Sequence, residues 1–296
     1  MLIVGRSRTK LARAAAADRE AKLSCEGFVS ADFRRLFKRM GTDYEAVYGH
    51  TGRELSLAPY EADVRSSLQD CYRRAAGGFK RNIRESLDPE LNAYYHAPVV
   101  AKDIDSRILK FISDRAPAQT QQILKTTRER MGDALVRAHI AAADAGMPGD
   151  KHFIGAEMRK WFTATAAGRA LNIATFEVNG ASEFAKQTEA TVLKNFAPKH
   201  AAFVVRNKAE DDEDIQPRVV LADANTEKGF LGKAWVADLD EKTRSFHADM
   251  DFVQVDVGDF FNVAGEKMLH PGDGQNGATM KNLANCRCCA IYYVGE

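Results

Sequence analysis

Apolar residues recur at helical spacing through the first two thirds of the chain. After Ser30-Ala31-Asp32, which has the composition of a helix start, Phe33, Phe37 and Met40 lie three or four residues apart. Similar patterns extend from Asp105 and through the residues that follow. We therefore expect helices over 6–23, 30–40, 60–83, 105–140, 153–162 and 170–189.

Proline and glycine residues at two places interrupt this helical region. Pro117 either begins a new helix or kinks the one that carries it, because proline has no N–H to donate. Gly146-Met147-Pro148-Gly149 ends the following segment. The apolar positions on either side of these signals should face neighbouring helices; they include Leu109, Ile123, Leu124, Met131, Leu135, Val136, Ile140 and Leu171.

The pattern changes after Thr191 to short apolar or alternating runs that are typical of strands. We expect strands over 201–205, 217–221, 233–237, 252–257 and 289–294. The acidic run 210–214 between the first two should be a solvated loop, and 270–274 has turn composition. The expected fold class is α+β, with a long helical N-terminal two thirds followed by a small antiparallel β unit.

Charge is balanced over the chain but uneven along it. The net charge is +1, which argues against a strong polyanion binder. Residues 1–40 nevertheless carry ten Lys and Arg against four acids, and residues 240–273 carry eight acids against three bases. The basic N-terminal region is either a contact surface for DNA or an acidic protein, or simply a solvated helix face.

Targeting signals and disulfide patterns are not evident. The apolar start, residues 1–4, ends at Gly5-Arg6, and no segment approaches the length of a membrane span. We therefore expect a cytosolic protein that contacts no membrane. Five cysteines, three of them at positions 286, 288 and 289, are better explained as free structural thiols or metal ligands than as a disulfide framework.

The C-terminal part carries a spaced set of motifs. A Trp-containing strand precedes Asp240-x-x-Thr243-Arg244-x-x-His247, and Pro271-Gly272-Asp273 and Asn285-Cys286-Arg287-Cys288 follow. In order and spacing this set resembles the C-terminal signature of the Mu F-like minor head proteins of tailed phages. The resemblance extends over about 104–294, with a long insertion at 191–232. Its signature residues here are Trp235, Asp240, Thr243, Arg244, His247, Asp251, Pro271, Gly272, Asp273, Asn285, Cys286, Arg287 and Cys288.

The resemblance implies a division of the chain and a role. Residues 1–103 would be a helical N-terminal region that matches no known family, and 104–296 a Mu F-like region with helices over 104–190 and β structure over 191–296. The implied function is that of a structural minor capsid protein in head morphogenesis, at the portal or in the capsid interior, with a part in DNA packaging or ejection. Portal protein, major capsid protein and packaged DNA are the implied partners. The protein would be assembled in the host cytoplasm and reside in the virion head.

The residues themselves favour structural roles. Asp240 suits a capped turn, Arg244 can bind Asp251 or a carbonyl of the last strand, and His247 can fix the turn by a hydrogen bond. Asn285 can bind its own backbone before the final strand. On this interpretation the protein is not an enzyme and needs no cofactor.

A zinc site is the alternative for the same residues. His247, Cys286 and Cys288, completed by Asp251 or His270, would supply four ligands. Positions i and i+2 of a strand share a face, which would let both thiolates reach one ion. The Cys-x-Cys spacing is nevertheless shorter than the usual Cys-x-x-Cys, so free thiols are the expectation preferred here.

Enzymatic alternatives have weaker support. An ADP-ribosyltransferase-like activity would use Arg169 and Glu177, but the sequence has no Glu-x-Glu pair and no Gly-rich phosphate loop. A Cys-His hydrolase would pair Cys286 with His247, but nothing in the sequence marks an oxyanion hole.

Overall fold

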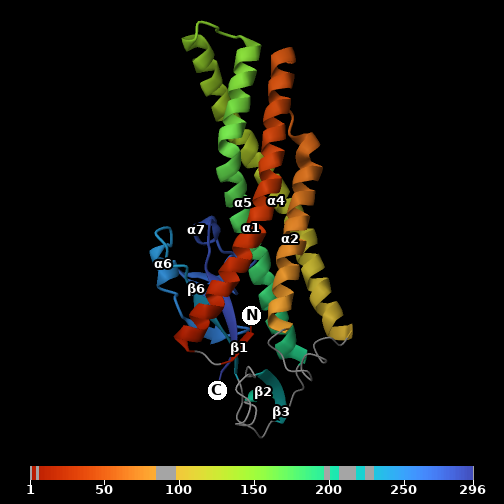
Figure 1. The fold of residues 1–296 in the computed structure, drawn as a ribbon, viewed down its shortest axis with the longest axis vertical. Coiled ribbons are helices and arrows are strands. Elements are labelled where there is room, and N and C mark those ends of the chain that lie inside the picture. Colours follow the sequence, from red (N-terminus) through yellow and green to blue (C-terminus); the bar gives the residue numbers. More distant parts are fainter. Residues whose placement is uncertain are drawn as a thin grey trace. The chain divides into compact units, whose positions relative to one another are not determined.

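The computed structural model describes residues 2–4, 7–84, 98–196, 201–206, 218–223 and 230–295. Four long helices make up most of it: α1 (Arg8–Thr51), α2 (Glu61–Arg84, after the short 3-10 helix η1, Ala58–Tyr60), α4 (Pro98–Asp144) and α5 (Lys151–Phe196) (Figure 1). A small, mainly antiparallel sheet near the C-terminus completes the fold, which confirms the α+β class. Among the described helices, none has a stretch long and apolar enough to span a bilayer.

The helices are more continuous than the sequence pattern predicted. The expected start at Ser30 is wrong, because α1 runs through it and the Ser30 hydroxyl donates to the Gly27 carbonyl at 3.1 Å instead of capping an end. Pro117 neither starts nor ends a helix but lies inside α4. The two segments expected at 153–162 and 170–189 are parts of the single helix α5.

The connection between α4 and α5 has the expected chemistry at both ends. Gly146 adopts a positive φ of 73°, and the Met147 N–H bonds the Ala142 carbonyl at 2.8 Å, as in a Schellman end. At the start of α5, one carboxylate oxygen of Asp150 accepts the N–H groups of His152 and Phe153, both at 2.9 Å. Gly146 and Asp150 therefore fix where the first helix ends and the second begins.

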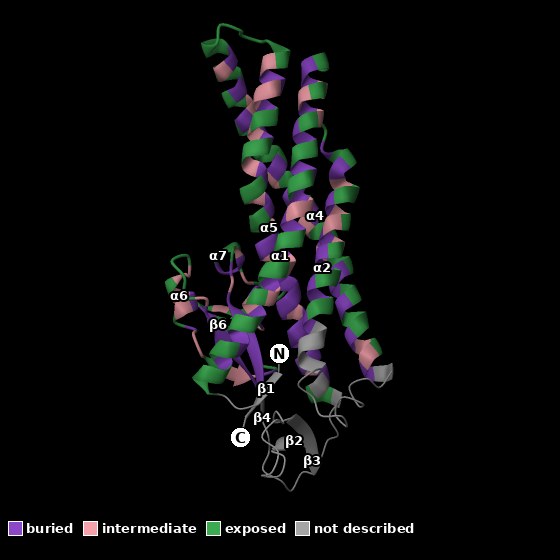
Figure 2. Cartoon of the chain, viewed as in Figure 1, coloured by how far each residue is buried: buried purple, intermediate pink, exposed green. Residues whose placement is uncertain are grey.

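Buried and exposed positions alternate along each long helix (Figure 2). The expected buried stripe of α4 is only partly correct: Ile123, Leu124 and Met131 are buried. Larger members of the predicted stripes lie exposed instead: Leu109, Val136, Ile140 and Leu171. Alanines take up much of the buried surface, and they include Ala134, Ala138, Ala142, Ala166, Ala170, Ala174, Ala181 and Ala185. The helical spacing of apolar residues was therefore not enough to predict which of them are buried, since some large ones are exposed and many small ones are buried.

The chain divides into two compact units, each assembled from separate segments. One consists of Met1–Cys25, Tyr72–Phe111 and Thr175–Glu296, and we call it the sheet unit. The other consists of Glu26–Cys71 and Ile112–Ala174 and is helical, so we call it the helical unit. Residues 103 and 104 both lie inside α4, and a domain division at that point stays a prediction.

The main sheet has the strand order β1-β8-β4-β5. Strand β4 (Phe230–Val236) pairs antiparallel with both β8 (Cys289–Gly295) and β5 (Gln254–Asp256), and β1 (Leu2–Val4) adds a parallel edge to β8. The edge strand β1 was not predicted, because three apolar residues at a terminus carry no periodic signal. Residue Phe252 has a φ of 61°, which keeps the expected strand at 252–257 from starting there.

Two hairpins and two short helices accompany the sheet. Strands β2 (Ala201–Arg206) and β3 (Arg218–Asp223) form the first hairpin, close to the predicted ranges. Strands β6 (Phe261–Val263) and β7 (Glu266–Met268) form the second, which was not predicted. Helices α6 (Ser245–Ala248) and α7 (Met280–Leu283) lie in the connections. The acidic run at 210–214 lies outside the described residues.

Candidate metal centre

Three of the signature side chains meet in the sheet unit. His247 lies on α6, and Cys286 and Cys288 lie in the segment that leads into β8. The Nδ1 atom of His247 is 3.6 Å from the Cys286 Sγ and 3.5 Å from the Cys288 Sγ. All three residues are buried, and their ligand atoms lie within 4.8 Å of one another. Despite the short Cys-x-Cys spacing, both sulfurs reach the imidazole, and the three residues form a group that could hold one metal ion.

A chain of hydrogen bonds orients the His247 ring. The amide nitrogen of Asn282 donates to the Glu266 carboxylate at 2.7 Å and to the Val263 carbonyl at 3.2 Å, so its oxygen is left as an acceptor. That oxygen is 3.2 Å from His247 Nε2, which must then carry the proton. The other ring nitrogen, Nδ1, faces the two sulfurs. Metal-binding histidines are commonly held in this way by a partner on the far ring nitrogen.

Aromatic side chains form a wall around the cluster. The Trp235 ring meets the His247 ring edge-on, with centroids 5.4 Å apart and an interplanar angle of 87°. Phe261 packs edge-on against the other side of the Trp235 ring, also at 5.4 Å. Met268 and Leu283 belong to the same buried cluster. The site therefore has a dry, apolar surround, which strengthens the electrostatic interactions inside it.

The two thiols differ in acidity because they share a hydrogen bond. The Cys286 thiol stabilises the sulfur of Cys288 as a thiolate, and His247 adds to this effect, so the pKa of Cys288 falls below the ordinary value although burial opposes the change. The same hydrogen bond, together with burial, raises the pKa of Cys286 well above the ordinary value. Two cysteine sulfurs next to an imidazole nitrogen are a donor set that suits a soft or borderline cation.

The turn before α6 is built from Asp240, Thr243 and Arg244. One Asp240 carboxylate oxygen accepts the Thr243 hydroxyl at 2.8 Å and the Lys242 N–H at 3.0 Å. The Thr243 hydrogen bond is the main reason that the pKa of Asp240 is lowered. Arg244 donates to the Ala284 carbonyl, and this bond joins the α6 turn to the segment that precedes Cys286. Neither expected partner of Arg244 is correct, because Asp251 accepts the Ala237 N–H and Ala284 precedes the last strand, β8.

Asp251 and Asp273 hold backbone turns. Asp251 accepts the Ala237 N–H at 2.9 Å, while Asp273 accepts the N–H groups of Leu269 at 2.7 Å and Gln275 at 2.9 Å. The carboxylate of Asp251 therefore serves the chain and not the cluster. Among the described residues, the only group with metal-ligand geometry is His247 with the two cysteines, so Asp251 and His270 are not the fourth ligand.

The remaining signature residues shape the backbone. Gly272 has a φ of 78°, and a Cβ there would lie 3.3 Å from the Asn179 side chain on α5, which explains a glycine at this point. Pro271 is buried beside it. Asn285 has a φ of 53°, and its exposed side chain has no hydrogen bond to any described residue, so its role is to tolerate this conformation. The half-buried Arg287 helps to lower the pKa of Asp240 by its charge.

A second buried polar cluster lies where α1 and α5 meet the sheet, and sequence reasoning missed it. Lys186 contacts Asp18 and Glu183, both at 2.7 Å, and Lys22 also bridges these two acids. Glu183 accepts the Ala290 N–H at 3.0 Å, while Lys186 donates to the Ala290 carbonyl at 3.1 Å. Two side chains of α5 thus occupy the edge of β8 that β1 covers from Tyr292 onward.

The candidate residues for the ADP-ribosyltransferase-like alternative lie in different units. Arg169 belongs to the helical unit, where its Nη2 donates to the Ile123 carbonyl at 3.0 Å and the Thr127 hydroxyl at 2.6 Å. Glu177 belongs to the sheet unit, where it is buried and accepts the Tyr72 hydroxyl at 2.6 Å. Each of the two residues supports the packing of its own unit.

Asn282 and Glu266 are the residues of the candidate centre that the sequence did not reveal. They belong to none of the recognised motifs, and their role depends on the β6–β7 hairpin, which carried no clear signal either. Comparison of the chain with protein-family models, with curated proteins and with solved structures gives no match.

Proposed function

We propose that this chain is a structural minor head protein of a tailed phage, acting in head morphogenesis at the portal or in the capsid interior. The observation that carries the proposal is the convergence of signature elements that lie far apart in the sequence. His247 contacts Cys286 and Cys288 in a buried cluster, and the half-buried Arg244 binds the Ala284 carbonyl just before it. In a non-enzymatic protein, we expect the residues of a family signature to stabilise one part of the fold together, and these residues do so.

The hydrogen bonds of the signature support a structural task. Asp240, Arg244, Asp251 and Asp273 each bind backbone groups of the β unit. A hydrolase would instead need His247 and Cys286 to reach a substrate, and both are 3% exposed or less. We therefore favour a head protein that is not an enzyme over an ADP-ribosyltransferase-like or hydrolytic domain.

The proposed partners are the portal protein, the major capsid protein and packaged DNA, and the proposed location is the virion head. Several N-terminal bases lie exposed on α1, and Arg13, Arg34 and Lys38 are among them. At about 100° per residue, these three positions fall on one face of the helix. Such a face provides the positive surface that a contact with DNA or an acidic protein requires.

The test is the composition of the particle. Phage heads produced from the genome that encodes this chain should contain it at low copy number, as measured by quantitative mass spectrometry of purified heads. Deleting its gene should yield defective heads, and supplying the chain in trans should restore them. Its absence from purified heads, together with normal assembly after deletion, would refute the proposal.

We further propose that the ion held by His247, Cys286 and Cys288 is zinc, in place of the free thiols expected from the spacing. With Zn–S bonds of about 2.3 Å and Zn–N bonds of about 2.0 Å, a tetrahedral ion sets sulfur and nitrogen about 3.5 Å apart. The two observed separations are 3.6 Å and 3.5 Å. A shared cation accounts for both short contacts between Nδ1 and the sulfurs.

Zinc in this position would stabilise the β unit. It would join α6 to the segment before β8, and three protein ligands leave one position of a tetrahedral ion for a further ligand. The ion supplies charge compensation for the thiolates, and its binding energy adds to the folding energy. The residues around it keep the ring oriented and exclude water.

Metal content tests the zinc proposal. Protein purified in metal-free buffers after expression with zinc should carry about one equivalent, and a chelator should lower its melting temperature. Cys288→Ser should abolish metal binding, whereas the matched control Cys289→Ser should keep it, because Cys289 is equally buried but its Sγ faces the Val236 carbonyl. The zinc proposal would be wrong if the purified protein is metal-free, its thiols at Cys286 and Cys288 are reactive, and added zinc has no effect. The two thiols would then be structural groups.

A further inference from the structure

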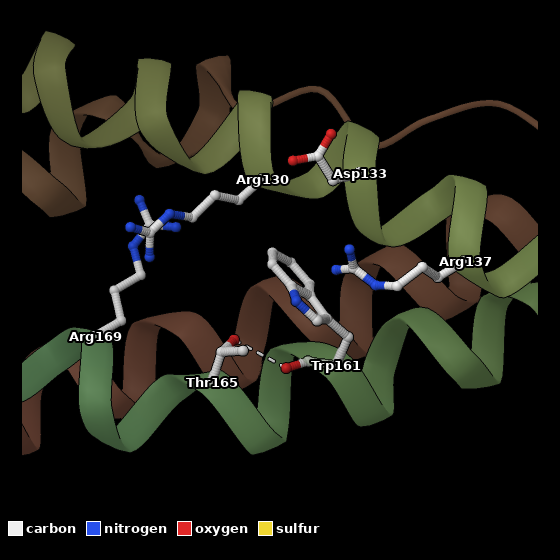
Figure 3. A pocket seen from close by; sticks show the side chains of 6 residues that line it. All are labelled: Arg130, Asp133, Arg137, Trp161, Thr165 and Arg169. Atoms are coloured by element: carbon white, nitrogen blue, oxygen red, sulfur yellow. Dashed lines mark hydrogen bonds between the residues drawn. The ribbon is translucent and has the colours of Figure 1, made fainter.

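The helical unit contains a pocket in which positive charges converge (Figure 3). It has a volume of about 200 Å³. Helices α4 and α5 line it, and the lining residues are Arg130, Asp133, Arg137, Trp161, Thr165 and Arg169. Three arginines and one aspartate thus line the pocket. Neither the metal centre nor the family signature involves any of these residues.

Two of the arginines point at one another from opposite walls. Arg130 reaches across from α4, and its guanidinium group lies next to that of Arg169 on α5 (Figure 3). Burial first, and then the charge of Arg130, lower the pKa of Arg169 to about 10. Among the residues that the structure describes, neither arginine forms an ion pair. The two positive charges repel one another, and a bound anion would reduce this repulsion.

Arg169 is held in position for such a contact. Its Nη2 makes all of its described hydrogen bonds, to the Ile123 carbonyl and to the hydroxyls of Thr126 and Thr127. The guanidinium group also lies over the Phe37 ring, 4.8 Å from its centroid. Because one edge of the guanidinium is fixed in this way, the rest of it can bind a ligand with little further loss of entropy.

We propose that this pocket binds a phosphate ester, with Arg130 and Arg169 gripping the phosphate and Trp161 flanking the adjoining group. Guanidinium groups match phosphate oxygens in charge and geometry. The volume fits a phosphate with part of its substituent, because pockets for larger ligands start at about 300 Å³. The flat Trp161 ring beside two cations suits a nucleotide. The ester can come from a free nucleotide or from a nucleic-acid strand.

The site can be tested with purified protein, independently of any role in a phage head. The probes are deoxyadenosine monophosphate and a fluorescently labelled single-stranded oligodeoxynucleotide. Arg130→Gln removes one half of the grip without disturbing the packing bonds of Arg169. Arg128→Gln removes an equal charge from an exposed position on the same helix, outside the pocket, and serves as the matched control.

We expect Arg130→Gln to weaken binding at least about fivefold and Arg128→Gln to have a much smaller effect, since only the former loses a charge-assisted phosphate contact. Loss of both probes in Arg130→Gln identifies a mononucleotide site. Loss of the oligonucleotide alone, with a salt slope reduced by about one, identifies a strand. Unchanged melting of the variants shows that they fold. If neither probe binds, or if the two variants weaken binding equally, the proposal is wrong.

Discussion

At the scale of single residues, Asn282 decides how the His247 ring is presented. Its amide contacts Val263, Glu266 and the imidazole at once, and it is fully buried. Without the amide, Nε2 has no acceptor and the ring can turn its proton toward the sulfurs. A small polar residue outside every motif therefore controls the donor set of the candidate centre.

We predict that Asn282→Ala lowers the free energy of unfolding by about 2 kcal/mol, because it leaves buried polar groups without partners. If zinc is bound, its affinity should also fall about 10- to 100-fold, as for other partners of metal-binding histidines. Chemical denaturation and metal competition measure the two effects. Gln275→Ala, at an exposed position, is the control and should change neither. A stable Asn282→Ala variant with intact metal affinity would contradict this role.

The sequence predicted the members of the centre better than their tasks. His247, Cys286 and Cys288 were identifiable because histidine and cysteine are rare and their spacing fits one strand face. Neither of the two partners expected for Arg244 is correct, because only folding places the Ala284 carbonyl, which lies outside the last strand, within reach. Asn282 was hidden because its contacts cross a hairpin that sequence periodicity does not reveal.

At the scale of elements, β8 shows how a helix can take the place of a strand. Strand β1 covers the edge of β8 from Tyr292 onward, and Glu183 and Lys186 bind the backbone of Ala290 before that point. The buried charges are paired with Asp18 and Lys22, so none is left uncompensated. This pairing lets α5 satisfy backbone groups that would otherwise be buried without partners.

Lys186→Met should lower the free energy of unfolding by about 3–5 kcal/mol, because removing one member of a buried ionic cluster leaves the opposite charges unbalanced. The control is Lys160→Met on the same helix, where an exposed pair with Glu157 is worth at most about 1 kcal/mol. Equilibrium unfolding in urea compares the two. A loss of similar size in both variants would show that the buried cluster does not contribute as proposed.

The same cluster predicts sensitivity to acid. Burial by itself would raise the pKa of Asp18, but Lys186 and Lys22 outweigh it and lower that pKa below its ordinary value. The stabilisation is present above the unfolded pKa of about 3.9 and is lost as the pH falls below it, with a slope of up to about 1.4 kcal/mol per pH unit. Unfolding measured between pH 5 and pH 2 should show this slope. The Asp18→Asn variant should lose this pH dependence. The control Asp32→Asn, which removes the acid of an exposed ion pair with Arg35, should keep it.

Helix positions were predictable and helix lengths were not. Apolar spacing located all four long helices, because a buried face leaves a periodic record. The helix start expected at Ser30 is wrong for a local reason, because the Ser30 hydroxyl donates to a carbonyl of its own helix. Of the two alternatives left open at Pro117, the start of a new helix is excluded, because the residue lies inside α4. Whether a helix ends depends on the packing of a whole turn, and the type of a single residue does not reveal that packing.

At the scale of the whole molecule, the net charge of +1 does not reveal that one side of α1 is basic. Along α1, buried residues such as Leu11, Phe33 and Met40 lie on one side, and exposed bases lie opposite. Of the ten N-terminal bases, Lys22 is buried among acids and Arg19 pairs with Asp238, so neither is available to a partner. Deleting residues 1–40 would remove core side chains, and substitutions on the exposed face are the cleaner test.

We predict that replacing Arg13, Arg34 and Lys38 together with Gln weakens binding to double-stranded DNA and makes its dependence on salt shallower. Each lost phosphate contact should reduce the slope of log K against log salt by about 0.9. The control replaces three exposed bases of α4 with Gln: Lys102, Lys125 and Arg128. Because both variants lose the same charge, a general electrostatic effect would weaken binding equally, whereas a contact face on α1 requires the first variant alone to lose slope. Equal slopes in the two variants, with melting temperatures unchanged, would leave the basic side of α1 as a solvated helix face.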